Sequence, residues 1–314
     1  MRVLFFGTAE FAVPSLEMLV ESGRHEVLAV VTQPDKPQGR GLKVAYSPVK
    51  HTALRLGLPI LQPKRVRSQS FIIQARELQP EALALAAFGQ IIPQALLDLP
   101  PKGPINVHGS LLPGYRGAAP IQHAILNGET VTGVTTMWMD ATLDTGDILL
   151  KAEVPIDPED TTGTLVPKMA SAGAKLLLAT LDGLQDGTCP RIRQDDELAT
   201  YAPAITPEDS AVRWEEPATR IGNQVRALSP RPGVFARFRN RKIKLWSVEV
   251  SSHRANEPGI VVSLTRDSVT VGTGNGAVEL LEVQPENSRR MSAAEWARGA
   301  RISTGDRFET VGSM

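Results

Sequence analysis

Apolar runs typical of buried strands alternate with helical patterns along the first half of the chain. Residues 2–6 (RVLFF) and 26–32 (EVLAVVT) are almost continuously apolar, and residues 11–22 between them carry apolar side chains at helical spacing. Strands of this kind alternating with helices predict a doubly wound, Rossmann-like α/β domain with a parallel sheet. The same patterns predict helices over residues 47–56, 69–78, 94–97, 120–127 and 161–181, and strands over 59–62, 82–87, 104–107, 132–139 and 148–152.

The pattern changes towards the C-terminus. Residues 188–206 contain prolines and scattered charges without a period, which is typical of a linker. A helix is predicted over 215–228, and a last one over 292–300. Between them lie five short alternating segments, which predict a small OB-like β-barrel, at 234–239, 242–250, 259–264, 268–273 and 277–283. We therefore expect an N-terminal domain over 1–187, a linker over 188–206 and a barrel domain over 207–314.

Composition excludes several classes of protein. The 314 residues carry no net formal charge, so nucleic acid would have to be bound through a local basic patch. A single cysteine, Cys189, excludes an intrachain disulfide and a cysteine-based zinc site, which fits a reducing cytoplasm. We see neither a signal peptide nor an apolar run as long as a membrane span, so we expect a cytoplasmic protein without a membrane partner. No dimerisation segment is visible, and we expect a monomer.

The candidate chemistry lies between residues 105 and 147. Asn106 and His108 are two positions apart at the end of a predicted strand, so both point to one side. An amide N–H with an imidazole could stabilise an oxyanion and move a proton during acyl transfer, and a carboxylate could fix the imidazole tautomer and favour its charged form. The later DATLDTGD loop offers Asp140, Asp144 and Asp147. Spacing alone neither chooses among these three nor excludes a metal.

Two long strings carry a resemblance to a known family. NVHGSLLPGYRGAAPIQHAI and GVTTMWMDATLDTGDIL resemble the folate-dependent formyltransferase family, most closely its members that act on methionyl initiator tRNA. The family's catalytic Asn, His and Asp match Asn106, His108 and Asp144, which leaves His123 as a structural residue. The resemblance implies transfer of a formyl group from 10-formyltetrahydrofolate to the α-amino group of methionyl initiator tRNA, without a metal. It also implies that folate contacts two segments, namely Phe88, Gly89, Gln90 and Ile91, and the turn Ser110, Leu111, Leu112 and Pro113.

Basic residues in two regions are the candidate tRNA contacts. QPDKPQGRGLKVAYS resembles the loop that these relatives insert into the tRNA acceptor stem, and it carries Lys36, Arg40 and Lys43, although Leu42 replaces a second lysine. Residues 220–244 hold six Arg, two Lys and no acid, with Phe235 and Phe238 interleaved. This predicts a nucleic-acid surface that includes Arg237, Arg239 and Arg241.

The linker departs from the family. Ala204 and Pro207 stand in place of lysines, and Arg213 stands in place of an aspartate. The resemblance therefore does not support tRNA contacts by the linker itself, and the basic run of the barrel would have to carry more of the binding.

Three alternatives remain. A relative that formylates a UDP-amino sugar or glycinamide ribotide, or that hydrolyses formylfolate, needs neither the basic loop nor the basic barrel. A nicotinamide oxidoreductase is disfavoured because the loop after the first strand, GTAEF, lacks the second and third glycines of GxGxxG. A non-catalytic RNA-binding protein would leave Asn106, His108 and Asp144 unexplained.

Overall fold

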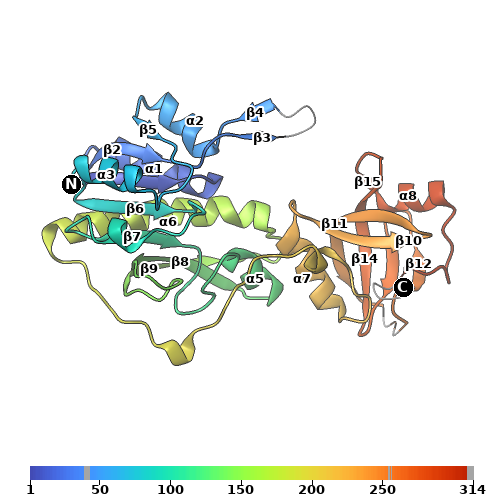
Figure 1. Ribbon diagram of the computed structural model, residues 1–314. Helices are drawn as coiled ribbons and strands as arrows, with labels where there is room; N and C mark the ends of the chain where they lie inside the picture. The colour runs from blue at the N-terminus through green and yellow to red at the C-terminus, as the bar shows by residue number, and fades with distance from the viewer. Residues whose placement is uncertain (39–42, 254, 256, 310–314) are drawn as a thin grey trace. The chain divides into compact units, whose positions relative to one another are not determined.

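The computed structural model describes residues 1–38, 43–253, 255 and 257–309, and it divides into two compact units (Figure 1). Unit 1 comprises Met1–Pro120, Val131–Pro155 and Val166–Ala202. Unit 2 comprises Ile121–Thr130, Ile156–Leu165 and Pro203–Met314. Within the described ranges, no helix is both long and apolar enough to cross a membrane.

Unit 1 is built on a seven-stranded sheet with the order β5-β2-β1-β6-β7-β8-β9 (Figure 1). Its five parallel strands are β1 (Arg2–Gly7), β2 (Glu26–Val31), β5 (Ile60–Leu61), β6 (Ala82–Ala86) and β7 (Pro104–His108). The predicted parallel sheet is thus confirmed for these strands. The last two strands of the sheet, β8 (Val131–Trp138) and β9 (Ile148–Pro155), run antiparallel to each other, because the short loop between them permits only a hairpin, and β8 also runs antiparallel to β7.

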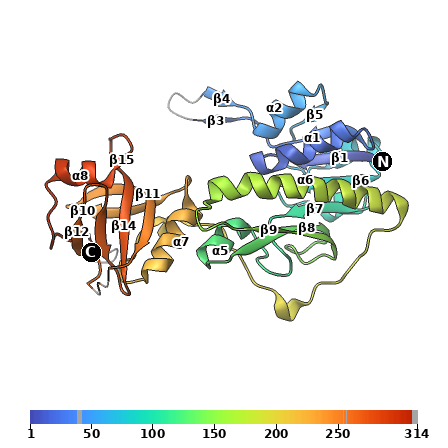
Figure 2. The same cartoon turned by 180° about the vertical axis from the view of Figure 1, so that it is seen from behind.

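Helices cover both faces of this sheet. On one face, Leu4, Phe6 and Leu83 pack against Phe71 of α3. On the other face, Gly173 of α6 approaches β7 and β8, and α6 lies in front of the strands in Figure 2. The helices are α1 (Val13–Ser22), α2 (Pro48–Arg55), α3 (Gln69–Glu77), α4 (Gln94–Leu97), α5 (Pro120–Leu126) and α6 (Thr162–Asp186), with 3-10 turns at Glu10–Ala12 and Asp196–Leu198. The unit boundaries fall within two of these helices, since residues 121–126 of α5 and residues 162–165 of α6 belong to unit 2.

We predicted the polar segment 33–47 as a loop, but part of it forms regular structure. It contains a short hairpin of β3 (Lys36–Gln38) and β4 (Lys43–Ala45). Strands of three residues, one of them containing Pro37, are too short to show a period of two in the sequence. Arg40 lies outside the described residues.

The segment predicted as a linker pairs with unit 1 as far as Ala202. Ile192 forms a bridge with Ile148, and the backbone of Arg116 bonds Thr200 and Ala202 with N–O distances of 2.8 and 2.7 Å. We call residues 191–202 the strap. In Figure 1 it is part of the olive trace that leaves the end of α6 and passes β9 and β8.

Unit 2 is built on a six-stranded antiparallel sheet. Its strands are β10 (Val234–Phe238), β11 (Arg241–Ser251), β12 (Val261–Leu264), β13 (Val269–Gly272), β14 (Ala277–Pro285) and β15 (Met291–Ser292). They pack with α7 (Ala218–Leu228) and α8 (Ala293–Ala300) around Trp214, Trp296 and Phe308, and a 3-10 turn lies at Glu208–Ser210. Phe238, which we predicted on the nucleic-acid surface, is only 4% exposed and belongs to this core, so that prediction is wrong. It lies on the inward side of β10, whose Phe235 is half-buried.

A buried histidine links the stability of unit 1 to pH. The Met1 ammonium lies 3.2 Å from His25 Nδ1, so Nδ1 accepts and Nε2–H donates to Asp182 Oδ1 at 3.1 Å. Burial, followed by the ammonium charge, lowers the pKa of His25 below its ordinary value of 6.5. The unfolded chain therefore takes up this proton first as the pH falls. The stabilisation is complete above pH 6.5 and is lost as the pH falls from there through the folded-state pKa.

We expect His25→Gln to reduce the loss of stability between pH 8 and pH 5, because glutamine does not titrate. Thermal unfolding midpoints across this range would measure the effect. His51→Gln is the matched control, since His51 is exposed on α2. Equal pH dependence in wild type and His25→Gln would contradict the assignment.

Candidate active site

The first two candidate residues lie at the end of β7. Asn106 and His108 pair with Met137 and Thr135 of β8, and both side chains leave the same side of the strand. Asn106 is half-buried, whereas His108 is only 6% exposed. A buried polar ring needs partners for its nitrogens.

Both nitrogens of His108 face oxygen atoms. Nε2 lies 2.9 Å from the carbonyl oxygen of Tyr115, which can only accept, so Nε2–H is the donor. Nδ1 lies 3.6 Å from Asp144 Oδ2. That separation is beyond hydrogen-bond length, and the contact is electrostatic. Only a doubly protonated ring presents an N–H to both oxygens, so the pair is arranged to hold or release a proton at Nδ1.

Asp144 is also held by a backbone N–H, through the same oxygen that faces His108. Its Oδ2 accepts a hydrogen bond of 2.9 Å from the backbone N–H of Gly117. Its backbone has φ +55, a left-handed conformation that is unfavourable by roughly 1–2 kcal/mol for most residues but is tolerated best by Asp and Asn. Gly117 has φ +122, and a Cβ there would lie 2.6 Å from the Ala202 oxygen, so only glycine lets the strap approach this closely.

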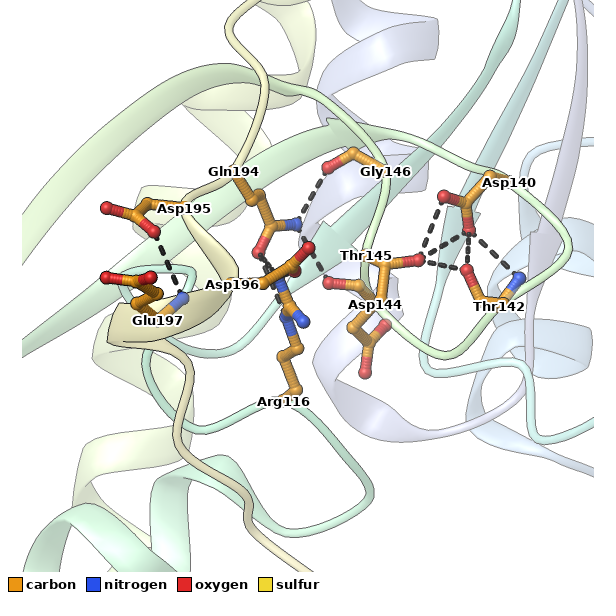
Figure 3. A network of polar contacts seen from close by, with 10 residues as sticks. All are labelled: Arg116, Asp140, Thr142, Asp144, Thr145, Gly146, Gln194, Asp195, Asp196 and Glu197. Carbon is orange, nitrogen blue, oxygen red and sulfur yellow. Dashed lines mark hydrogen bonds and ion pairs between the residues drawn. The ribbon is translucent and has the colours of Figure 1, made fainter.

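The structure separates the three carboxylates that spacing could not distinguish. Asp140 accepts from Thr142 and Thr145 within its own loop (Figure 3). Asp147 pairs with Arg191 of the strap at 2.6 Å. Asp144 alone of the three contacts His108 among the described residues, in agreement with the choice that the resemblance made.

A network behind Asp144 was missed by sequence reasoning (Figure 3). Gln194 of the strap donates from Nε2 to the carbonyl oxygens of Asp144 and Gly146, at 2.8 and 2.7 Å. Its Oε1 accepts from Nε and Nη2 of Arg116, at 3.1 and 2.9 Å, and Arg116 also pairs with Asp196 at 2.8 Å. No motif marks a contact between residues 78 positions apart, and Gln194 lies in a segment without periodicity.

The predicted folate loop after β6 has one outward side chain. Ile91 is 90% exposed, whereas Phe88 is buried against Phe6 with ring centroids 5.3 Å apart. Gln33 donates to the carbonyls of Phe88 and Gly89, at 2.9 and 3.2 Å, and Gln90 accepts from the Val66 N–H. Gly89 has φ +80, which a glycine adopts without strain. The side-chain and backbone contacts thus fix the loop while leaving Ile91 at the surface.

The SLLP turn is mostly interior. Ser110 and Leu112 have no exposed surface, and Thr135 bonds both of their backbones, at 2.7 and 3.0 Å. Leu111 is half-buried, and the carbonyl of Pro113 accepts from Thr200 of the strap at 3.3 Å. Ser110 and Leu112 therefore shape the turn. Neither has exposed surface through which it could make the predicted contact with folate.

The predicted tRNA-binding residues differ in their exposure and in their contacts within the protein. Lys36 is exposed and donates to Gln33 at 3.2 Å, Arg40 lies outside the described residues, and Lys43 begins β4. In unit 2, Arg237 and Arg241 are exposed on β10 and β11. Arg239 instead pairs with Asp306 at 3.1 Å and donates to the Ala300 carbonyl, so it is partly engaged within the unit.

Cations stack on aromatic rings beside these arginines. Lys242 lies 3.8 Å from the centre of the Phe235 ring, and Lys244 and Arg290 lie 3.9 and 4.8 Å from the centre of the Trp246 ring. We call these five residues the cation–aromatic platform. Burial, helped by Arg231 and Arg290, lowers the pKa of Lys244. Sequence reasoning found the lysines within the basic run but missed Trp246 and Arg290, because β11 and the turn before β15 are brought together only by the sheet.

The sequence matches the models and curated members of a known family. Residues 1–181 match the model of the formyl transferase family, and residues 204–301 match that of its C-terminal domain. Two curated relatives are methionyl-tRNA formyltransferases. That of Caldanaerobacter subterraneus is 49% identical over 97% of this chain and 99% of its own length. That of Acetivibrio thermocellus is 47% identical over 98% and 99%.

Solved structures share the fold at low identity. HypX from Aquifex aeolicus, in complex with tetrahydrofolic acid, is 18% identical with a TM-score of 0.64, over 95% of this chain and 47% of its own. An N-formyltransferase from Helicobacter canadensis, in complex with folinic acid and dTDP-3-aminofucose, is 19% identical with a TM-score of 0.67, over 89% and 98%. The matches to the family models and the 49% and 47% identity to the curated relatives show that the chain belongs to the formyl transferase family and, within it, to the methionyl-tRNA formyltransferases.

Proposed function

We propose that this enzyme transfers the formyl group of 10-formyltetrahydrofolate to the α-amino group of methionyl initiator tRNA. The contact of buried His108 with Asp144, beside Asn106, carries the proposal, because acyl transfer to an amine needs both an oxyanion donor and a proton acceptor. The proposal includes the predicted cytoplasmic monomer that works without a metal.

The loop after β6 offers an apolar side chain and backbone groups to the flat folate ring. Ile91 offers an exposed apolar side chain, and the left-handed backbone at Gly89 turns the loop beside it. We assign Phe88, Gly89, Gln90 and Ile91 to the folate side of the site, with Leu111 and Pro113 of the SLLP turn. The folate donor is a substrate of the transfer, supplying the formyl carbon and leaving as the amine.

Each catalytic residue has a separate task in this proposal. The amino nitrogen of the acceptor forms a bond to the formyl carbon, and the formyl oxygen becomes negatively charged. Asn106 donates its amide N–H to that oxygen. Both nitrogens of His108 already face oxygen acceptors. We therefore assign His108 and Asp144 to proton transfer, in which they take the proton that the attacking nitrogen releases and pass it to the departing nitrogen. The carbon–nitrogen bond to folate then breaks.

Two basic regions are assigned to tRNA. Lys36, Arg40 and Lys43 belong to the segment that resembles the acceptor-stem loop of the family. In unit 2, Arg237, Arg239, Arg241 and the cation–aromatic platform combine charge for phosphates with rings for unpaired bases. We accordingly propose that residues 1–187 carry catalysis together with the first basic region, and that residues 207–314 carry the second basic region and bind tRNA, joined by residues 188–206.

A formyl-transfer assay tests the function directly. Wild-type enzyme would be given 10-formyltetrahydrofolate with methionyl initiator tRNA, a UDP-amino sugar, dTDP-3-aminofucose or glycinamide ribotide. Transfer to the tRNA alone is expected. Transfer to a small acceptor, or hydrolysis of the donor without transfer, would overturn the assigned acceptor while retaining the folate site.

We expect the double variant Lys242→Ala/Lys244→Ala to weaken tRNA binding and to make it less sensitive to salt. Each lost phosphate contact lowers the slope of log K against log salt by about 0.7–0.9, and loss of stacking adds a salt-independent part. Binding would be measured at several salt concentrations with Arg266→Ala/Arg298→Ala as the control, which removes two exposed charges from the β12–β13 turn and α8. Equal effects of the two double variants would show that only net charge matters.

A further inference from the structure

We propose that Gln194 is a positioning residue for catalysis, and that the strap holds both members of the His108–Asp144 pair at their working separation. The inference rests on the proposed function. It assigns a catalytic purpose to a segment that the sequence suggested was only a linker.

Only one orientation of the Gln194 amide matches the hydrogen-bond donors and acceptors around it (Figure 3). Its NH₂ group meets two carbonyl oxygens, those of Asp144 and Gly146, while its oxygen meets two N–H groups of Arg116. A flipped amide would set donors against donors and acceptors against acceptors. Gln194 is 5% exposed and Arg116 is 2% exposed, so water does not replace these bonds.

These bonds act on the backbone around Asp144. Asp144 has a left-handed backbone, and the two carbonyls that Gln194 holds are its own and that of Gly146, two residues later. Fixing both carbonyls fixes the planes of two peptide groups, the one between Asp144 and Thr145 and the one between Gly146 and Asp147. The direction in which the Asp144 carboxylate leaves the backbone is thereby set towards His108.

The strap also reaches the other side of the histidine. Thr200 Oγ1 accepts from the backbone N–H of Tyr115 at 2.8 Å, and the carbonyl of Tyr115 accepts from His108 Nε2. Arg116, the next residue, pairs its backbone with Thr200 and Ala202. One segment therefore holds the acceptor on each side of the imidazole, through Thr200 for Tyr115 and through Gln194 for Asp144.

The test is a double-mutant cycle. Gln194→Ala is expected to lower kcat by up to about 100-fold, with KM for tRNA and for folate changed little, because a small displacement of a catalytic group slows chemistry rather than binding. In an Asp144→Asn background the same substitution should change kcat far less, because that background has no carboxylate to position. The control is Asp195→Asn, whose side chain bonds only the nearby Glu197 N–H among the described contacts.

A readout independent of activity completes the test. The ¹⁵N signals of the His108 imidazole, assigned with His108→Ala, would be titrated in folate-free protein. Gln194→Ala and, as a second variant should that one not fold, Thr200→Val are expected to shift this titration, whereas Asp195→Asn is not. Unchanged kcat in Gln194→Ala, equal losses in both backgrounds, or an unmoved His108 titration would each overturn the proposal. Absence of formyl transfer by wild-type enzyme would instead overturn the proposed function.

Discussion

His108→Ala is expected to lower kcat by about 100- to 10,000-fold, the range typical of a removed general acid–base group. The alanine leaves the Asp144 carboxylate without the ring that faces it at 3.6 Å, so the proton of the attacking amine loses its acceptor. Binding should change little, because the buried ring has almost no surface to offer either substrate in the ground state. Single-turnover formyl transfer to methionyl initiator tRNA would measure the chemical step free of product release.

The matched control is His123→Ala. His123 lies on α5, and its Nε2 bonds the Pro203 carbonyl at 3.1 Å, so its loss removes an imidazole without touching the site. We expect near wild-type kcat from this variant. A His108→Ala enzyme with unchanged kcat would remove the histidine from the mechanism, and a bell-shaped pH profile that lost one limb in this variant would support it.

Most elements of the fold were predictable because their patterns are local. The strands of unit 1 are short apolar runs, and α2 begins where Ser47 precedes Pro48, with Ser47 Oγ accepting from the Lys50 N–H at 3.1 Å. The prediction that failed depends on contacts between residues far apart in the sequence. Phe238 alternates with polar neighbours like a surface aromatic, but Trp296 and Phe308, far along the chain, enclose it.

The candidate site also contains residues that the sequence predicts and residues that it does not. Asn106 and His108 could be paired from the sequence because period-two geometry places them together, whereas the choice of Asp144 needed the family resemblance. The structure adds a reason for that choice, since Asp140 is bound within its own loop and Asp147 is held by Arg191. Gln194 and Arg116 carry no signal in composition or spacing. Their pairing follows from the course of the strap around unit 1, and only tertiary structure contains that information.

Asn106→Ala is expected to lower kcat by about 100- to 1,000-fold, as the loss of one oxyanion donor does elsewhere. The donor acts mainly on charge that develops during the reaction, so folate and tRNA affinities should stay nearly constant. Single-turnover rates, with separate binding measurements for both substrates, would distinguish this from a packing defect at the end of β7.

Asn106→Asp makes the same test more demanding. Aspartate keeps the shape of asparagine but replaces the N–H donor with a negatively charged acceptor, which would face the developing oxyanion. We expect a loss at least as large as that of Asn106→Ala, with the fold retained because the side-chain volume is preserved. An aspartate variant with wild-type kcat would show that Asn106 fills space rather than donating a hydrogen bond. The oxyanion would then have to be stabilised by a backbone N–H of the site.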